Sequence, residues 1–104
     1  MIYRIGFTSE AIADLDRMAL WLNVHGSEAA ANRWLTRLLK SLKSLERLPE
    51  IHPIAEDMSE LAGFPVRETL FGKRPNVYRI LYTVDADAVN VIAIRHAAQE
   101  PIER

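Results

Sequence analysis

Two amphipathic helical segments follow one another in the first half of the chain with almost nothing between them. Residues 28–48 place leucines on one helical face and Lys or Arg on the opposite face, until Pro49 ends the pattern. Residues 9–24 carry an apolar stripe of their own, and Gly26 and Ser27 supply the end of one helix and the start of the next. Because so short a junction holds two helices side by side, the sequence predicts an antiparallel αα-hairpin.

The remaining segments mostly show the two-residue alternation of strands. Residues 1–7 form the first such segment, and three more follow the helices, at 66–71, 76–84 and 88–96. The apolar run at 91–94 is typical of a central strand with both faces covered. Residues 49–65 hold three prolines and no sustained period, so we expect a long loop there with a turn of helix near Met58. The order β-α-α-β-β-β predicts an α+β fold, a helical hairpin packed on a mostly antiparallel four-stranded sheet.

The composition indicates one domain spanning residues 1–104 and excludes several kinds of function. Thirteen Lys or Arg against fourteen Asp or Glu give a net charge of −1, too little to hold nucleic acid by overall charge. The chain contains no cysteine, which rules out disulfides, thiolate catalysis and zinc-thiolate sites. The N-terminus lacks the apolar stretch of a signal peptide, so we expect a cytoplasmic protein with no membrane partner.

Each of the three C-terminal strand segments contains one arginine, namely Arg67, Arg79 and Arg95. A guanidinium inside a strand is unusual unless it pairs with a carboxylate or faces a polar site. If the strands are neighbours, these arginines form either separate salt bridges or an anion-binding surface for a phosphodiester or a partner carboxylate. His96, next to Arg95, is a candidate acid or base, because histidine is the usual side chain for proton transfer near neutral pH.

The histidines do not favour a metal site. His25, His52 and His96 have neither the i, i+4 pairing nor the accompanying carboxylate of zinc motifs. We therefore expect no metal and no cofactor.

The basic face of the second helix forms a ribbon of one sign, made of Arg33, Arg37, Lys40, Lys43 and Arg47. It is either the solvated side of an amphipathic helix or a contact surface for phosphates or an acidic partner segment.

The element order, the segment "NVYRILYTVDADAVNVIAIRH" and the helix exit "SLERLPEIHP" together resemble the RelE/ParE superfamily of type II toxins, also called plasmid-stabilisation toxins. The most specific part is Tyr78 to Tyr82, then an acidic turn, an apolar strand and Arg95-His96. The resemblance covers nearly the whole chain. It implies a growth-inhibiting toxin that a cognate antitoxin neutralises with a flexible, acidic tail, in a toxin–antitoxin hetero-oligomer.

Members of this superfamily differ in their target, and the chain resembles the ParE-like members more closely. ParE-like toxins bind DNA gyrase, whereas RelE-like toxins cleave messenger RNA on the ribosome and are strongly basic. Here the second strand offers only Arg67 as a cation, and residues 97–101 carry no positive charge. In the alternative of an endonuclease, Arg79 would hold the scissile phosphate with Arg67, Arg95 and His96 as auxiliaries. A non-toxic binding module is a second alternative.

The antitoxin tail is expected in an apolar groove formed by the helical hairpin and the sheet. Arg33, Arg37 and Lys40 would rim this groove and attract the acidic side chains of the tail.

Overall fold

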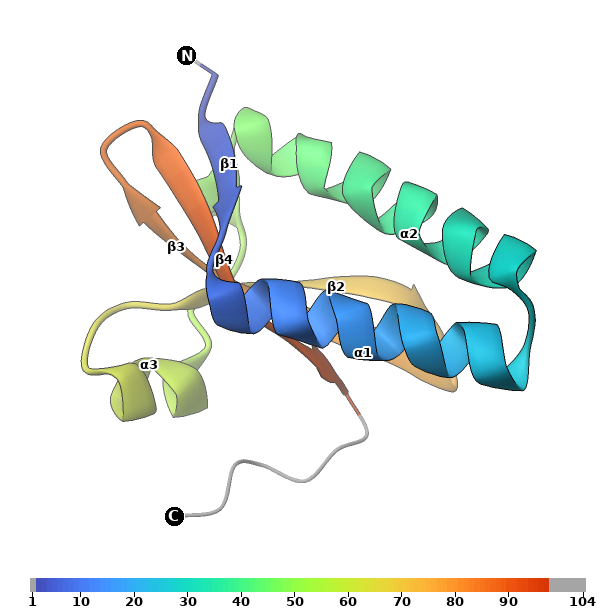
Figure 1. Cartoon of the computed structure of the whole chain (residues 1–104). Coiled ribbons are helices and arrows are strands. Elements are labelled where there is room, and N and C mark those ends of the chain that lie inside the picture. The colour runs from blue at the N-terminus through green and yellow to red at the C-terminus, as the bar shows by residue number, and fades with distance from the viewer. Residues whose placement is uncertain (1, 98–104) are drawn as a thin grey trace.

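The computed structural model describes residues 2–97 and confirms the predicted α+β fold (Figure 1). Its elements, in chain order, are β1 (Arg4–Phe7), α1 (Ser9–His25), α2 (Glu28–Leu42), η1 (Lys43–Glu46), η2 (Pro49–Ile51), α3 (Glu56–Ala62), β2 (Arg67–Lys73), β3 (Asn76–Asp85) and β4 (Ala88–His96). The expected loop before β2 thus holds a short 3₁₀ helix, η2, and the full helix α3. None of the helices in this described range has the length and apolar character that a membrane crossing requires.

The sheet is mixed, with the strand order β1-β4-β3-β2. β4 pairs antiparallel with β3 and parallel with β1, and β2 pairs antiparallel with β3. One parallel pair therefore lies beside two antiparallel ones, which confirms the prediction of a mostly antiparallel sheet. β4 has a strand neighbour on each side, and its apolar run is covered on both faces of the sheet, because Val91 and Ile94 belong to one apolar cluster and Ala93 belongs to the other.

The predicted αα-hairpin forms because polar caps start both helices and a glycine ends the first. Thr8 Oγ1 and Ser27 Oγ each accept a hydrogen bond from a backbone N–H of the following turn, at 3.1 and 3.0 Å. Gly26 N donates to the carbonyl oxygen of Leu22 (2.8 Å), and a Cβ on Gly26 would lie 2.9 Å from that oxygen. The tight turn makes α1 and α2 converge, as Figure 1 shows.

The second helix is shorter than its periodicity predicts. α2 ends at Leu42, and the chain continues as the 3₁₀ helix η1, whereas the leucine spacing predicts a helix up to residue 48. Ser44 Oγ donates to the carbonyl oxygen of Ser41 (2.9 Å), a local bond that competes with regular helix geometry. Leu45 is fully buried in η1 all the same, so apolar spacing alone does not reveal where the α-helix ends.

Two apolar clusters pack against the two faces of the sheet. The larger lies between the sheet and the α1–α2 hairpin and includes Trp34, Leu38, Ile80, Tyr82 and Val91. The smaller lies between the sheet and α3 and consists of Ala55, Met58, Val66, Leu81 and Ala93. Tyr82 donates its hydroxyl to the carbonyl of Pro49, and burial raises the pKa of Tyr82 to about 12.

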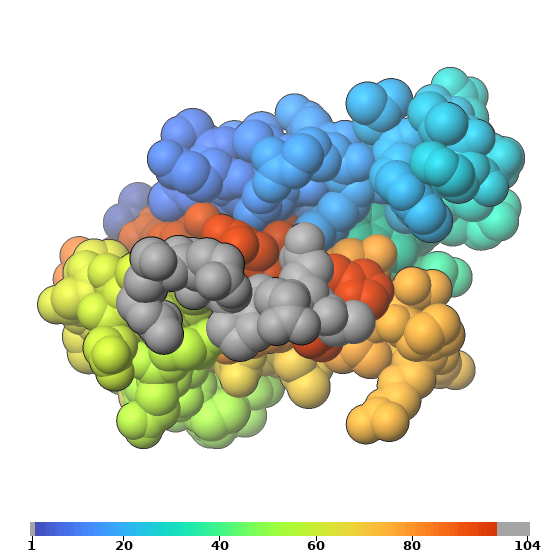
Figure 2. Space-filling model, turned by 90° about the horizontal axis from the view of Figure 1, so that it is seen from below, coloured from blue at the N-terminus to red at the C-terminus, as the bar shows by residue number. Residues whose placement is uncertain are grey.

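α1 continues the edge of β4 where β1 ends. β1 pairs with β4 only as far as Val91. Thr8 N then donates to Val91 O (3.0 Å), and Thr8 Oγ1 donates to Ile92 O (3.2 Å). Further along α1, the buried carboxylate of Asp14 accepts a hydrogen bond from Ile94 N (2.9 Å). In Figure 2 the blue α1 accordingly lies along the red β4, with the yellow-green α3 segment on the other side.

Candidate functional site

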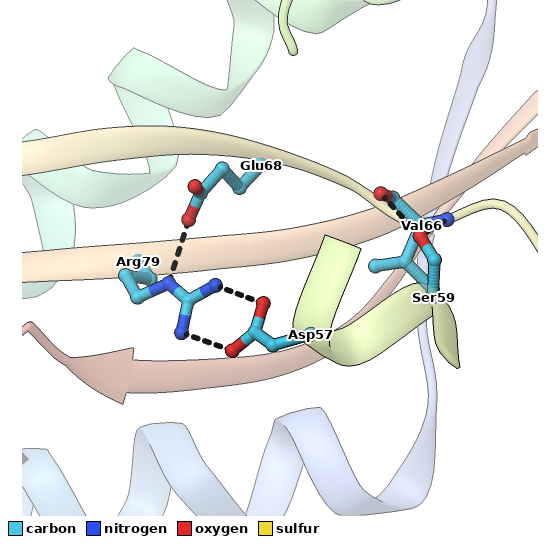
Figure 3. Close-up of polar contacts among 5 residues, drawn as sticks. All are labelled: Asp57, Ser59, Val66, Glu68 and Arg79. Atoms are coloured by element: carbon cyan, nitrogen blue, oxygen red, sulfur yellow. Dashed lines mark hydrogen bonds and ion pairs between the residues drawn. The ribbon is translucent and has the colours of Figure 1, made fainter. Parts of the chain in front are cut away.

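Arg79, the candidate ligand for a scissile phosphate, is held by two carboxylates. Its Nε donates to Glu68 Oε1 on β2 (2.6 Å), and its Nη1 and Nη2 donate to Asp57 Oδ2 (3.1 Å) and Oδ1 (2.9 Å) on α3 (Figure 3). The side chains of Arg79 and Glu68 are 24% and 25% exposed, and that of Asp57 is 46% exposed. The guanidinium therefore joins β3 to both β2 and α3.

The contact between Arg79 and Asp57 also shifts the pKa of both groups. The hydrogen bond from Arg79 is the main cause that holds the pKa of Asp57 below its ordinary value. The hydrogen bond to Asp57 is likewise the main cause that raises the pKa of Arg79 above its ordinary value. An incoming phosphate would have to compete with two bonded carboxylates for this guanidinium.

A second contact fixes α3 beside this cluster. Ser59 Oγ donates to Val66 O (3.1 Å) and accepts a hydrogen bond from Val66 N (2.8 Å), as Figure 3 shows. α3 is thus tied to the start of β2 as well as to β3. This double attachment holds Asp57 in position against Arg79.

Arg67 fastens the loop that precedes α3. Its Nη1 donates to the carbonyl oxygens of Glu50 (3.1 Å) and His52 (2.7 Å). In the strand pairing Arg79 lies opposite Arg95, whereas Arg67 lies opposite Tyr82. The structure therefore places two of the three strand arginines in register and leaves Arg67 apart from them.

Arg95 and His96 line a pocket at the end of β4. The cavity has a volume of about 510 Å³ and is bounded by Arg17, Met18, Trp21, Asn76, Tyr78, Ile94, Arg95 and His96. His96 Nε2 lies 3.4 Å from Asn76 Oδ1, and the imidazole meets the ring of Tyr78 edge-on at a centroid distance of 5.1 Å. We call this cavity the β4 pocket. Of the four candidate catalytic residues, Arg95 and His96 are the two that share it.

The contribution of α1 to the β4 pocket was not predicted. Arg17 and Trp21 lie one helical turn apart and both line it. Trp21 is 57% exposed and stands outside the apolar stripe of Leu15, Ala19 and Leu22. A large ring outside the apolar stripe of a helix, one turn from an arginine, is the signal that could have revealed this wall.

The three cations predicted to bind the antitoxin lie exposed on α2. A small apolar groove of about 160 Å³ lies between α2 and β1, and Leu39, 44% exposed, forms part of its wall. Lys43 and Glu46 supply the charges of this groove. Arg33, Arg37 and Lys40 thus share a helix with the groove without lining it.

The histidines are dispersed over the fold. His25 stacks on Trp21 with ring centroids 4.4 Å apart, and His52 meets Tyr82 edge-on at 6.4 Å. Within residues 2–97, no three His, Asp or Glu side chains converge in the way that a metal site requires.

Comparison with protein families settles what kind of chain this is. A family model described as "ParE toxin of type II toxin-antitoxin system, parDE" matches residues 5–101. The chain belongs to the ParE toxin family. The match confirms the resemblance stated above and places this ParE-family protein on the ParE side of the superfamily.

A solved structure supports the fold of the ParE-family chain. The structure, described as the chromosomal ParDE TA system from P. aeruginosa, is 19% identical in sequence, with a TM-score of 0.73. The match covers 91% of this chain and 96% of that chain. At this identity the likeness concerns the fold. The comparison with curated proteins gives no significant match.

Proposed function

We propose that this ParE-family protein inhibits growth by binding DNA gyrase and that a cognate antitoxin with an acidic tail neutralises it. Membership of a toxin family supports the toxic role. The similar solved structure, described as a ParDE TA system, supports a partnership with an antitoxin. In this proposal the protein acts through protein contacts and cleaves no phosphodiester itself.

The hydrogen bonds of Arg79 are the observation that favours gyrase binding over RNA cleavage. RNA cleavage requires a cation at the scissile phosphate together with a general base and a general acid. Arg79 is hydrogen-bonded to Glu68 and Asp57, and Arg67 is hydrogen-bonded to two loop carbonyls. Two of the four candidate catalytic residues are thus engaged within the fold, which leaves an incomplete set for an endonuclease.

A supercoiling reaction with purified gyrase tests this proposal. Micromolar toxin should reduce the supercoiling of relaxed plasmid, because gyrase held on cleaved DNA cannot reseal it. Digestion of the bound enzyme with protease should then release linear plasmid, which is measured by gel electrophoresis. Growth arrest on expression without an antitoxin verifies that the toxin used is active.

The alternatives predict different outcomes of the same experiments. Unchanged supercoiling by a preparation that arrests growth would contradict gyrase binding. Ribosome-dependent cuts in reporter messages, abolished by Arg79→Ala, would show the endonuclease instead. Unchanged colony counts on expression would show a non-toxic binding module.

A further inference from the structure

The β4 pocket has the size and the fixed walls of a small-molecule site. Its volume of about 510 Å³ falls within the range of cavities that bind metabolite-sized ligands. It lies beyond the end of β1, where α1 takes over the edge of β4. The hydrogen bond from Ile94 N to Asp14 joins the α1 wall to the strand wall.

The charges in the described lining are positive or titratable, with no carboxylate among them. Arg17 is already paired with Asp14. Arg95 differs, because its Nε is buried and finds no hydrogen-bond partner among residues 2–97. A buried guanidinium donor without an acceptor raises the free energy of the folded protein, and an anion on the accessible part of the guanidinium would offset part of that cost by its charge.

Aromatic rings form much of the remaining lining. The indole of Trp21 is held by stacking on His25, with 19° between the two rings. Tyr78 is fixed edge-on between Trp34 (5.4 Å) and His96 (5.1 Å). The Tyr78 hydroxyl is protonated at neutral pH and can donate a hydrogen bond, and burial raises its pKa further. Rigid rings beside a guanidinium whose Nε has no acceptor suit a flat ligand that carries a negative charge.

We propose that the β4 pocket binds a phosphorylated nucleoside, with the phosphate at Arg95 and the base packed on Trp21. A guanidinium binds phosphate through parallel hydrogen bonds, and an exposed indole offers a stacking surface to any base. A phosphate alone would leave most of the cavity unfilled. The ligand is either a free nucleotide or the 5′ end of a strand. This site does not depend on the proposed binding of gyrase.

Tryptophan fluorescence of the full chain measures this binding, because one of its two tryptophans, Trp21, lines the pocket. We expect adenosine monophosphate to quench the fluorescence saturably, with a Kd below about 1 mM. Adenosine and inorganic phosphate should each bind at least about tenfold more weakly, because each makes only part of the contacts. Trp21→Phe should abolish the change, since Trp34 lies outside the lining.

A short 5′-phosphorylated oligonucleotide distinguishes the two sources of the ligand. An affinity equal to that of adenosine monophosphate would identify a free nucleotide. An affinity at least about tenfold higher would identify the end of a strand, because neighbouring nucleotides would add contacts. Either result supports the pocket.

Substitution of Arg95 tests the phosphate contact. Arg95→Lys keeps the positive charge but removes the guanidinium, so adenosine monophosphate should bind about tenfold more weakly. Arg4→Lys makes the same exchange at an exposed position of β1, away from the pocket, and should bind like the original chain. Thermal unfolding verifies that both variants are folded.

NMR of the unmodified chain keeps the proposal testable if Arg95→Lys does not fold. Adenosine monophosphate should shift the resonances of the Trp21 indole and the Ile94 amide. The absence of both saturable quenching and these shifts at millimolar nucleotide would overturn the proposal. Shifts confined to the basic face of α2 would overturn it as well, since they would reflect general attraction of phosphate.

Discussion

At the scale of residues, the contacts of Arg79 determine how one face of the sheet responds to acid. Of the two carboxylates that bond to Arg79, Asp57 is the more exposed. Solvent screening therefore limits the Arg79–Asp57 ion pair to about 1 kcal/mol. The folded protein holds the pKa of Asp57 below its ordinary value. Its contribution to stability is therefore complete above the unfolded carboxyl pKa of about 3.9 and is lost as the pH falls through the lower folded value.

Asp57→Asn should lower the free energy of unfolding by about 1 kcal/mol at neutral pH, because it removes the negative charge beside Arg79. The difference from the original chain should shrink steadily below about pH 4, where the carboxyl becomes protonated. Urea unfolding over a pH series measures both effects. Asp16→Asn, at an exposed position of α1, is the matched control and should show little change. An equal loss for Asp57→Asn at neutral and acid pH would mean that the ion pair is not the cause.

At the scale of elements, α1 both covers one face of the sheet and completes the hydrogen bonding of its β4 edge. The carboxylate of Asp14, only 5% exposed, accepts from Ile94 N and pairs with Arg17. The Asp14 carboxylate thus accepts the hydrogen bond that the carbonyl of a neighbouring strand would otherwise accept. β1 can therefore be as short as Arg4–Phe7.

Asp14→Ala should lower the free energy of unfolding by about 2–3 kcal/mol, because it leaves the buried Ile94 N–H without an acceptor. Asp14→Asn should lower it by about 1 kcal/mol, since an amide oxygen still accepts that bond. Arg17→Ala should cost less than about 1 kcal/mol, because the side chain of Arg17 is mostly exposed. Urea unfolding compares the three variants. If Arg17→Ala were as damaging as Asp14→Ala, the ion pair and not the edge hydrogen bond would hold α1 in place.

The elements that the sequence predicts well are those with strong local signals. Capping residues and a glycine define the αα-hairpin, and alternation with a tight turn defines β3 and β4 within a residue at each end. α3 lacks a side-chain N-cap and has only seven residues, so the sequence indicates a turn of helix near Met58 but not the full helix. At the end of α2 the hydroxyl of Ser44 bonds to the backbone within a continuous leucine pattern, so the pattern does not show where the α-helix stops.

The candidate site is less predictable because its contacts cross elements. Glu68 follows Arg67 in sequence, yet it bonds to Arg79 on the next strand, and Asp57 comes from a helix that was not expected in full. The α1 wall of the β4 pocket arises from the parallel pairing of β1 with β4, which strand periodicity does not encode. Strand arginines can be found from sequence, but their partners require the topology.

At the scale of the whole molecule, a nearly neutral chain presents a local positive surface on α2. The net charge is −1, yet Arg33, Arg37 and Lys40 are exposed and form no ion pair within residues 2–97. Such a surface can draw an acidic segment toward the protein even though the overall charge does not.

Replacing Arg33, Arg37 and Lys40 together with glutamine should slow association with the cognate antitoxin about tenfold at low salt, because electrostatic steering is lost. The salt dependence of the association rate should fall as well. A triple glutamine variant of Arg4, Lys73 and Arg74, which are exposed and lie outside the basic face of α2, removes the same charge elsewhere and is the control. Stopped-flow association kinetics measure the rates. Unchanged rates in the α2 variant would place the antitoxin contact on another surface.

β4 lies between β1 and β3 in the sheet, although it is synthesised after both. Until residues 88–96 have been made, β1 has no strand to pair with and Asp14 has no backbone donor. The hydrogen bond from Thr8 to Ile92, for example, joins residues that are 84 positions apart in the sequence. Contacts between such distant positions form late in folding. A nascent chain therefore cannot complete its sheet until most of it has been translated, and in the proposed partnership an antitoxin would meet the folded surface only from that stage on.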